Sequence, residues 1–378
     1  MYNFLLKNKK NILIFLILIS IVSFIDTIRK GFLNGCDFQW QPAVLFWEGI
    51  NHYQKFISNG KSDFLCQGGE YAHLFNVILY PYTLVKWEIA RGLWIFTNIC
   101  FSLAIPIIIC KNFNLSKYKT IILLLIFLTC YPTRMTINYG QQSLFVLFFL
   151  ILPFVYKSNL SFLLSGLSSI KYSTGYIIFF DYLVKKQFKN FILASIPYLL
   201  GWFIYFSYTN SDPIINFFEP LDWSLNYKQY TRDADIYSLL QMYFIDTNQV
   251  YLKYFSIIFV FILNLFFLIK INKLSDNFLK MSLILICPLI FFPHSNYDYI
   301  LLFPLLCYSI SNTDYLASKL NIYFVIYFFY FNRIINHLID FDTLYQPLLL
   351  FFMILLLIIN IYSYKNKEHL YFFKYILL

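Results

Sequence analysis

"GLWIFTNICFSLAIPIIIC", residues 92–110, is an uninterrupted apolar run that decides how this chain folds. A helix that crosses a bilayer needs about 20 consecutive, mainly apolar residues, and this run reaches that length without one charged side chain. Runs of the same kind recur from residue 11 to residue 363. The sequence therefore predicts an all-α polytopic membrane protein, with residues 1–378 forming a single transmembrane domain.

The composition supports this prediction. The 378 residues are 60% hydrophobic and 22% aromatic, and only 13% are charged, whereas about a quarter of a soluble domain is charged. The net charge of +10 does not indicate nucleic-acid binding, because the lysines fall in short clusters between apolar runs rather than on one continuous face. We expect them to anchor the chain against anionic membrane lipids.

Lysines near helix ends set the predicted orientation, because short cytoplasmic loops carry an excess of Lys and Arg. Lys7, Lys9 and Lys10 place the N-terminus in the cytoplasm, before a first helix over about 11–28. No small-x-small cleavage site follows that helix, so we expect it to be retained.

The next choice sets the direction of the run at 92–110. The stretch 74–85 is apolar, but it is short and broken by Pro81, which predicts an interfacial helix rather than a span. Residues 92–110 then run inward and bring Lys111 into the cytoplasm. The opposite choice would put that lysine and its neighbours outside.

We predict a bundle of about twelve membrane segments, with both termini in the cytoplasm and two long outer loops at residues 29–90 and 209–250. The later segments are expected near residues 120–136, 141–156, 158–170, 173–184, 190–208, 251–269, 279–293, 297–312, 319–337 and 345–363. The cytoplasmic connections are short and rich in lysine. The working surface is therefore predicted on the outer face of an inner or plasma membrane.

The arginines fall on the opposite side from most lysines. All five are predicted outside: Arg29, Arg91, Arg134, Arg232 and Arg333. A guanidinium group binds anions through paired hydrogen bonds, which favours an outer anion site. The alternative is that these arginines anchor the membrane interface and pair with outer acids.

"GCDFQWQPAVLFWEGINHY", residues 35–53, places two carboxylates and five aromatic rings at the exit of the first helix. Asp37 can act as a base in a partly dry cleft, and rings such as that of Trp40 can stack on sugars. The alternative is an aromatic belt at the membrane surface with solvated acids. Glu48 is the second acid of this stretch.

Three further outer turns carry candidate residues. Lys171 lies in "SGLSSIKYSTGYIIFF", between two apolar half-helices, where a charge is costly unless it binds an anion or reaches the interface. Arg134 and Gln141 lie in "YPTRMTINYGQQ", before a helix whose free N–H groups favour anions. His294 and Asp298 lie in "FFPHSNYDYILLFP", without the further ligands that a zinc site needs.

The cysteines and two acidic triplets give weaker indications of function. The seven cysteines form no CxxC pair, although Cys36 and Cys66 share the first outer loop and could form a disulfide there. "DAD" at 233–235 and "DFD" at 340–342 echo a metal-binding signature of nucleotide-sugar transferases. Both are predicted outside, where nucleotide sugars are not supplied, so we interpret them as loop acids.

Several of these stretches together resemble glycosyltransferase family 87, whose members are polytopic GT-C enzymes that use polyprenyl-phosphate sugars, often mannose. The family pattern is similar to residues 35–53, to Gly140 and Gln141, to "IKYSTGY" around Lys171 and to "PHSNYD". The residues in register within these stretches are Asp37, Ala43, Gly49, Tyr53, Gly140, Gln141, Lys171, Pro293, Tyr297 and Asp298.

The chain also departs from the family pattern. His52 and Tyr172 stand where proline is usual, and "EYAHLF" replaces a Tyr-Pro-Pro element. These departures bear on the substrate rather than on the fold.

The resemblance implies a glycosyltransferase that moves a hexose or pentose, with mannose favoured, from a polyprenyl-phosphate sugar to a glycolipid or cell-envelope glycan. Polyprenyl phosphate leaves readily, so one base suffices and no metal or other cofactor is required. Asp37 is the expected base, and the transfer inverts the anomeric carbon. The expected phosphate ligands are Lys171, Arg91, Arg134 and Arg232. The expected sugar or acceptor ligands are Trp40, Tyr53, Gln141, His294 and Asp298.

Two other functions stay open. A flippase or transporter of polyisoprenoid lipids also needs an intramembrane lysine, but it would show polar openings on both sides of the membrane. A polymerase or ligase of the O-antigen type shares the lipid-phosphate chemistry, but its catalytic elements usually lie in a large late loop.

Overall fold

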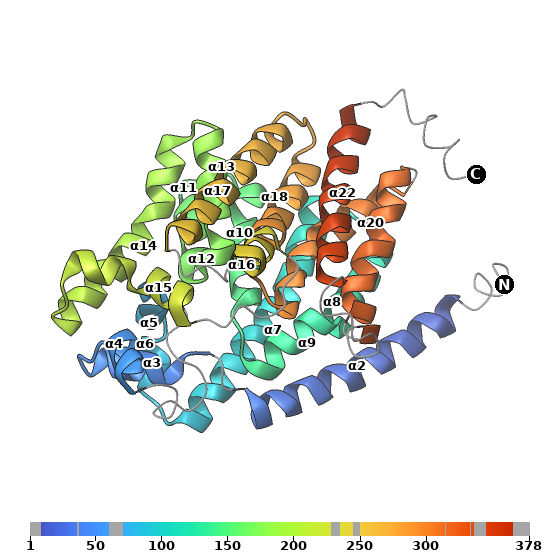
Figure 1. The fold of residues 1–378 in the computed structure, drawn as a ribbon. Coiled ribbons are helices and arrows are strands. Elements are labelled where there is room, and N and C mark those ends of the chain that lie inside the picture. The colour runs from blue at the N-terminus through green and yellow to red at the C-terminus, as the bar shows by residue number, and fades with distance from the viewer. Residues whose placement is uncertain are drawn as a thin grey trace.

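The computed structural model describes residues 9–35, 38–59, 71–227, 235–244, 250–313, 315–332, 334–335 and 345–365. Every regular element in these ranges is a helix (Figure 1). The predicted all-helical fold class is therefore confirmed.

The helices of the first half, in chain order, are α2 (Lys9–Asn34), α3 (Trp40–Trp47), α4 (His52–Asn59), α5 (His73–Ile78), α6 (Tyr80–Thr83), α7 (Trp87–Asn112), α8 (Lys117–Thr129), α9 (Tyr131–Tyr139), α10 (Ser143–Val155), α11 (Asn159–Ser165), the 3₁₀-helix η2 (Gly166–Ile170), α12 (Tyr172–Gly175) and α13 (Ile177–Val184). Those of the second half are α14 (Phe188–Thr209), α15 (Pro213–Tyr227), α16 (Ile236–Phe244), α17 (Val250–Asn272), α18 (Asn277–Phe291), the 3₁₀-helix η3 (Asn296–Leu302), α19 (Phe303–Ser311), α20 (Leu316–Ile326), the π-helical turn η4 (Tyr327–Phe331) and α22 (Tyr345–Lys365).

Three helices are long and apolar enough to cross a membrane: α7, α14 and the part of α17 from Phe255 to Asn272. The bent pair of α8 and α9 makes a fourth candidate if it counts as one span. Other apolar helices, including α10 and α18, have only 10–17 residues. The helices thus support a membrane protein, whereas about twelve membrane segments are not confirmed in the described part of the chain.

The segment predicted near 120–136 is two helices rather than one. α8 ends at Thr129, Cys130 adopts an extended conformation, and α9 continues at an angle of 49°. Pro132 explains the break, because within a continuous helix its ring would clash with the carbonyl of Leu128. In the first turn of α9 the missing N–H of proline costs nothing.

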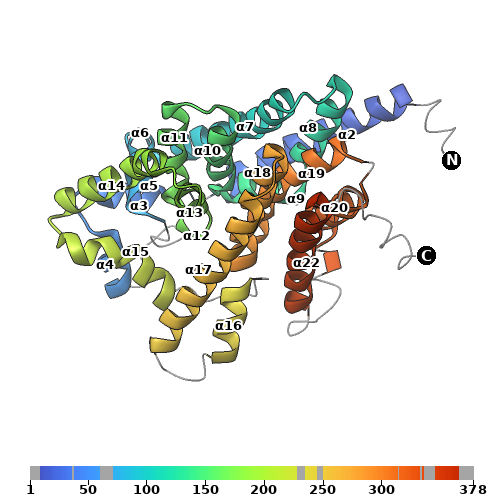
Figure 2. The ribbon, with the colours of Figure 1, turned by 90° about the horizontal axis from the view of Figure 1, so that it is seen from above.

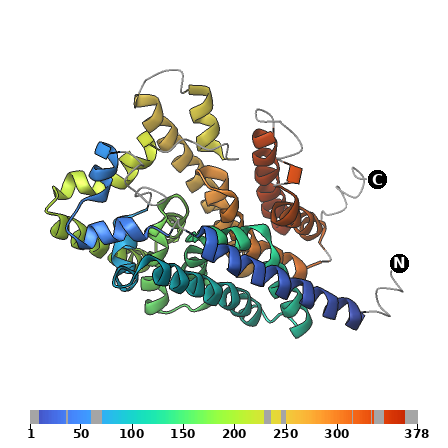
Figure 3. The ribbon, with the colours of Figure 1, turned by 90° about the horizontal axis from the view of Figure 1, so that it is seen from below.

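The core is centred on α18, in which every residue from Met281 to Phe291 is buried. A helix that is apolar on all sides must be surrounded by other elements, and α18 contacts α10, α13, α17, α19 and α22. α16 lies beside α17 and α20 lies beside α22 (Figure 2). Seen from below, α2 crosses the outside of the helical body next to α7, α8 and α9 (Figure 3).

The short helices α3 to α6 gather at one end of the molecule, near α15 (Figure 1). Two tryptophans tie them together: Trp40 Nε1 donates to the carbonyl of Tyr82 at 3.0 Å, and Trp47 Nε1 donates to that of Asn76 at 3.1 Å. α5 packs on α14 without space for a side chain, since a Cβ on Gly201 would lie 2.5 Å from Leu74 Cα. The first long loop is therefore fixed to the helical body.

The connections between helices contact one another in two groups. At one end, Lys119 Nζ donates to the carbonyl of Ile310 at 2.9 Å, and Asn272 donates to Asp181 at 3.0 Å. At the other end, Ala72 N donates to the carbonyl of Ile170 at 3.0 Å. Lys119, Ile310, Asn272 and Asp181 lie in helices next to connections predicted as cytoplasmic, whereas Ala72 and Ile170 lie in stretches next to turns predicted as outer.

Candidate functional site

Lys171 lies at the turn between η2 and α12, as the predicted hairpin requires. Its carbonyl accepts hydrogen bonds from Thr174 N at 3.1 Å and from Gly175 N at 2.7 Å, which starts α12. A Cβ on Gly175 would lie 2.2 Å from the carbonyl oxygen of Ser168, so only glycine allows so tight a turn. The turn presents the side chain of Lys171 to the inside of the bundle, where the residue is 8% exposed.

The ammonium group of Lys171 contacts both carboxylate oxygens of Asp298 at 2.6 Å. Asp298 is 1% exposed, so this is a buried ion pair between residues 127 positions apart in the sequence. A buried charge is tolerated only when it is paired and hydrogen-bonded. Lys171 Nζ also lies 4.6 Å from the centre of the Tyr297 ring, a cation–π distance.

Two further groups hold the carboxylate of Asp298. Ser143, the first residue of α10, donates from its Oγ to Oδ1 at 2.6 Å. Ser295 N donates to Oδ2 at 2.9 Å. The Ser295 bond is part of a capping box at the start of η3. Asp298 is therefore placed by three different parts of the chain before any substrate binds.

Gln141 joins this pair to the first long loop. It lies two residues before Ser143, directly after Gly140, which has a positive φ of 74° and ends α9. Gln141 Oε1 accepts a hydrogen bond from Tyr71 OH at 2.8 Å, and the carbonyl of Tyr71 accepts one from Tyr53 OH. The predicted residues Lys171, Asp298, Gln141 and Tyr53 thus belong to one connected polar region.

His294 lies on the same turn as Asp298. It is 2% exposed, its Nδ1 is 3.2 Å from the carbonyl of Phe292, and its ring contacts that of Tyr299 edge-on. Its role in orienting a sugar or acceptor remains a prediction.

The two predicted phosphate-binding arginines that the structure describes, Arg91 and Arg134, contact groups other than Lys171. Arg134 Nε donates to Thr27 Oγ1 at 3.2 Å, and a terminal nitrogen of Arg134 lies 3.9 Å from the carboxylate of Asp26 on α2. Arg91 lies over the ring of Trp87, at 5.6 Å from its centre. Arg232 falls outside the described residues, as does Arg333.

Asp37 and Cys36 also lie outside the described residues, and so does Cys66. The described neighbours of Asp37 pack against the end of α9. An ideal Cβ on Gly35 would lie 3.5 Å from the carbonyl oxygen of Asn138, and one on Gly140 would lie 3.7 Å from Phe38 Cβ. This is the end of α9 from which Gln141 continues.

The aromatic residues after Asp37 belong to a ring stack in which Phe38 and Trp94 are buried and Trp40 and Trp87 are half-buried. The Phe38 ring stacks on Trp87 at 5.3 Å and on Trp94 at 5.8 Å between centres, and Trp40 lies 5.6 Å from Trp87. Trp94 Nε1 donates to the carbonyl of Gly140 at 2.8 Å. These rings fix the segment that follows Asp37 against α7 and α9.

Gln39 is a candidate that sequence reasoning missed. It is 3% exposed, has a positive φ of 63°, and neither atom of its side-chain amide has a hydrogen-bond partner among the described residues. A left-handed backbone at a residue other than glycine, and a buried amide without partners, both cost free energy. Such features gather at functional sites, and nothing in the sequence around Gln39 indicates them.

Glu219 is a second missed residue. Its carboxylate is 7% exposed and accepts hydrogen bonds at 2.8–2.9 Å from the side-chain amides of Asn51, Gln54 and Asn216. No ion pair involves it in the described ranges. It joins α15 of the second long loop to α4 of the first, and a lone acid in a long polar loop gave no signal for this in the sequence.

His52 and His73 lie in a buried aromatic cluster next to this junction. Tyr205 OH and His52 Nδ1 are 2.7 Å apart, and the His73 ring lies edge-on to Tyr205 at 4.4 Å between centres. Neither ring nitrogen of His73 has a partner among the described residues. Burial lowers the pKa of His73 from 6.5 to about 3 and also lowers that of His52, so both rings are neutral near pH 7.

Acidification is expected to destabilise the protein through His73. Below pH 6.5 the unfolded chain takes up a proton at this residue, whereas the folded chain does not until about pH 3, so the free energy of unfolding falls as the pH falls between these values. At pH 5 the loss from His73 is about 2 kcal/mol. Thermal melts at pH 7.5 and pH 5 should show a smaller drop for His73→Leu than for the unchanged protein. An equal drop in both proteins would contradict this origin of the pH dependence.

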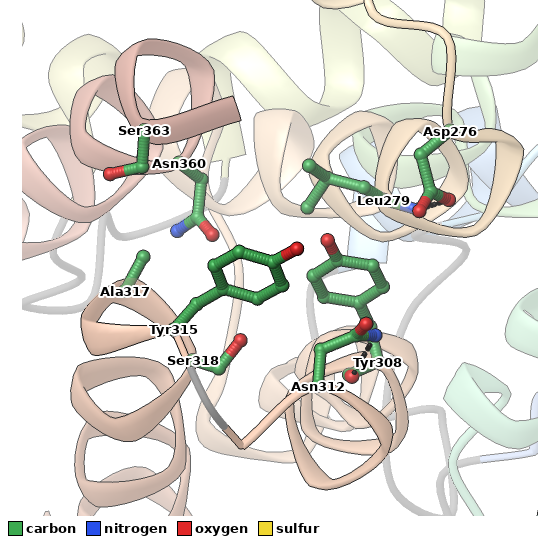
Figure 4. Close-up of a pocket in the computed structure, with 9 residues that line it drawn as sticks. All are labelled: Asp276, Leu279, Tyr308, Asn312, Tyr315, Ala317, Ser318, Asn360 and Ser363. Carbon is green, nitrogen blue, oxygen red and sulfur yellow. Dashed lines mark hydrogen bonds between the residues drawn. The ribbon is translucent and has the colours of Figure 1, made fainter. Parts of the chain in front are cut away.

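A separate pocket of about 200 Å³ lies between α18, α19, α20 and α22 (Figure 4). The rings of Tyr308 and Tyr315 lie side by side in it, with Asp276 on one side and Asn360 and Ser363 on the other (Figure 4). It includes none of the predicted site residues. The site formed by Lys171 and Asp298 is therefore distinct from this pocket.

The described residues contain no group of three or more His, Cys, Asp or Glu side chains that could hold a metal ion. In the "DAD" stretch, Asp235 accepts hydrogen bonds from Ser238 N at 2.7 Å and from Ser238 Oγ at 2.6 Å, beside the start of α16. Asp235 thus acts as a helix cap, in agreement with its interpretation as a loop acid. The "DFD" stretch lies outside the described residues.

Comparison with known proteins identifies the family. A model of glycosyltransferase family 87 matches residues 71–293, more than half of the chain. The matched range includes Gln141 and Lys171 but neither Asp37 nor Asp298. No match was found among curated proteins or among solved structures. The predicted family is therefore confirmed over residues 71–293, and the chain belongs to glycosyltransferase family 87, a family of membrane glycosyltransferases.

Proposed function

We propose that this protein moves one hexose or pentose, with mannose favoured, from a polyprenyl-phosphate sugar to a glycolipid or a cell-envelope glycan. The observation that carries the proposal is the buried pair of Lys171 and Asp298, connected through Ser143 and Gln141 to the first long loop. A lysine kept charged inside an apolar bundle suits the binding of a lipid-linked phosphate.

Lys171 is the proposed ligand of the donor phosphate. An ammonium group has three N–H donors, and the carboxylate of Asp298 orients it through contacts of 2.6 Å to both oxygens. Asp298 then acts as a positioning residue that keeps Lys171 charged in the absence of donor. As the bond to the sugar breaks, negative charge grows on the phosphate, and the ammonium group stabilises it.

Asp37 is the proposed general base. It takes the proton of the acceptor hydroxyl while the acceptor oxygen forms a bond to the anomeric carbon. The bond from that carbon to the phosphate oxygen breaks, so polyprenyl phosphate leaves and the configuration inverts. The packing of Gly35 and Phe38 against the end of α9 supports this role, because Gln141 follows the same end.

The remaining predicted residues are proposed to bind the sugar and the acceptor. Trp40 belongs to the ring stack that follows Asp37, and Gln141 and Tyr53 belong to the polar network. The side-chain amide of Gln39, which has no partner among the described residues, offers its N–H donors and its acceptor oxygen to a sugar hydroxyl. Arg91 lies over Trp87 of this stack, whereas Arg134 pairs with α2.

The reaction is proposed to occur on the outer face of an inner or plasma membrane, with both termini in the cytoplasm. The lysine-rich connections lie at the end opposite to Lys171, which supports this orientation under the positive-inside rule. The scheme needs no metal, because side chains can neutralise a monophosphate.

Membership of a glycosyltransferase family favours transfer over transport. The location of the proposed site disfavours a polymerase or ligase, since the site includes residues of the first long loop and of α10 rather than of one large late loop.

The test is incubation of the purified protein with a panel of labelled polyprenyl-phosphate sugars and a membrane lipid extract, followed by mass analysis. We expect one donor to give a product heavier by a single sugar, and we expect the same yield with a metal chelator present. Slow donor hydrolysis without any glycosylated product would contradict the proposal and favour the transporter.

A further inference from the structure

A basic pocket lies at the end of the bundle opposite to Lys171. Its volume is about 390 Å³, and its polar wall includes Lys157 after α10, Lys185 after α13, Lys280 in α18 and the buried Asp181. Three lysines thus face one cavity that contains a single acid. None of them belongs to the proposed transfer site.

The acid of this pocket is already satisfied. Asp181 Oδ2 lies 2.5 Å from Lys185 Nζ, and its Oδ1 accepts a hydrogen bond from Asn272 at 3.0 Å. No ion pair to Lys157 or Lys280 is formed within the described part of the chain, and their charges and that of Lys185 act on one another. The pocket therefore carries an excess of about two positive charges.

The other wall of the pocket is apolar. It contains Phe154, whose ring centre is 5.2 Å from Lys185 Nζ, together with Phe162 and Ile178. Next to the lining residues in the sequence, Leu183 is 40% exposed and Phe188 is 61% exposed. A cavity with a basic wall and an apolar wall, next to exposed apolar residues in the sequence, suits an anionic head group attached to acyl chains.

Helix lengths separate this pocket from the transfer site. Lys157 follows Ser143 by 14 positions, mostly along α10, and Lys185 follows Lys171 by the same number along α12 and α13. At 1.5 Å per residue, the two ends are about 20 Å apart. One phosphate cannot occupy both sites.

We propose that this pocket binds a phosphate group, and that its source is the head group of an anionic phospholipid in the cytoplasmic leaflet. Basic pockets between membrane helices on the cytoplasmic side suit such head groups. The proposal rests on the membrane orientation proposed above, but it does not depend on the donor, the acceptor or the base.

The test uses delipidated protein in a neutral detergent. Native mass spectrometry and thermal melts are recorded with added phosphatidylglycerol, with phosphatidylcholine and with inorganic phosphate. We expect one phosphatidylglycerol to stay bound and to raise the melting temperature, whereas phosphatidylcholine does neither. Stabilisation by millimolar inorganic phosphate to the same extent as by phosphatidylglycerol would keep the phosphate site and overturn the lipid as its source.

The matched variants remove two charges without touching the pair of Lys185 and Asp181. Lys157→Gln with Lys280→Gln should weaken phosphatidylglycerol binding about 30-fold, since each lysine near a membrane surface contributes about a fivefold factor. The control, Lys117→Gln with Lys273→Gln, removes two exposed lysines from outside the pocket and should bind normally. Equal binding by both double variants, or no binding by the unchanged protein, would overturn the proposal.

Discussion

Replacing Asp37 with asparagine is expected to reduce sugar transfer about 10²- to 10⁴-fold, because the amide cannot accept the proton of the acceptor hydroxyl. The two side chains have nearly the same volume, so we expect the variant to fold and to retain the donor. Product is measured by mass analysis at saturating donor, and donor retention by binding of the labelled lipid. Transfer near the normal rate in Asp37→Asn would exclude this residue as the base.

Glu48 offers a matched control for Asp37. It is the other acid of residues 35–53, but it lies exposed at the end of α3, where its backbone N–H closes the helix. Glu48→Gln should therefore transfer sugar at close to the normal rate. If both variants lose activity equally, the loss reflects the charge of the loop rather than proton transfer by Asp37.

The helical fold could be predicted from apolar runs, but the ends and breaks of the helices could not. The pattern over 120–136 is apolar throughout, and the bend at Cys130 follows from the geometry of Pro132 rather than from hydrophobicity. The turn at Lys171 lies where the hairpin was predicted, but each of its two predicted helices is divided in the structure, into α11 and η2 before the turn and α12 and α13 after it.

The sequence indicated several residues of the candidate site, but it did not indicate which of them contact one another. Lys171 and Asp298 were each singled out as charged residues at predicted outer turns, yet nothing in the sequence links residues 127 positions apart. Ser143, which donates a hydrogen bond to Asp298, lies only two residues after Gln141, so the sequence could have indicated it as a candidate. The unpartnered amide of Gln39 could not be foreseen, since its cost arises only after folding buries it.

Composition was a poorer guide to the arginines. Their rarity and their shared side suggested one anion site, but Arg134 instead ties α9 to Asp26 and Thr27 of α2. The alternative of pairing with outer acids holds for this residue. The distribution of arginines along the sequence predicts which side of the membrane they face. Only the packing of the helices decides which of them contact one another.

Breaking the pair of Lys171 and Asp298 on one side is expected to destabilise the protein by about 3–5 kcal/mol, because it leaves one buried charge without a partner. Lys171→Gln leaves the carboxylate with the donors Ser143 Oγ and Ser295 N but without its opposite charge, and Asp298→Asn removes the opposite charge of the ammonium group. Thermal melts in detergent measure both losses.

The double variant, Lys171→Gln with Asp298→Asn, separates stability from chemistry. Both charges are gone and two amides can pair, so most of the lost stability should return. Transfer should nevertheless stay about 10²- to 10³-fold below normal, since no cation remains to stabilise the phosphate as its charge develops. Recovery of transfer together with stability would show that the pair only holds η3 against the Lys171 turn. Loss of transfer in a stable double variant instead assigns the charge of Lys171 to the reaction, because a purely structural pair would have been replaced.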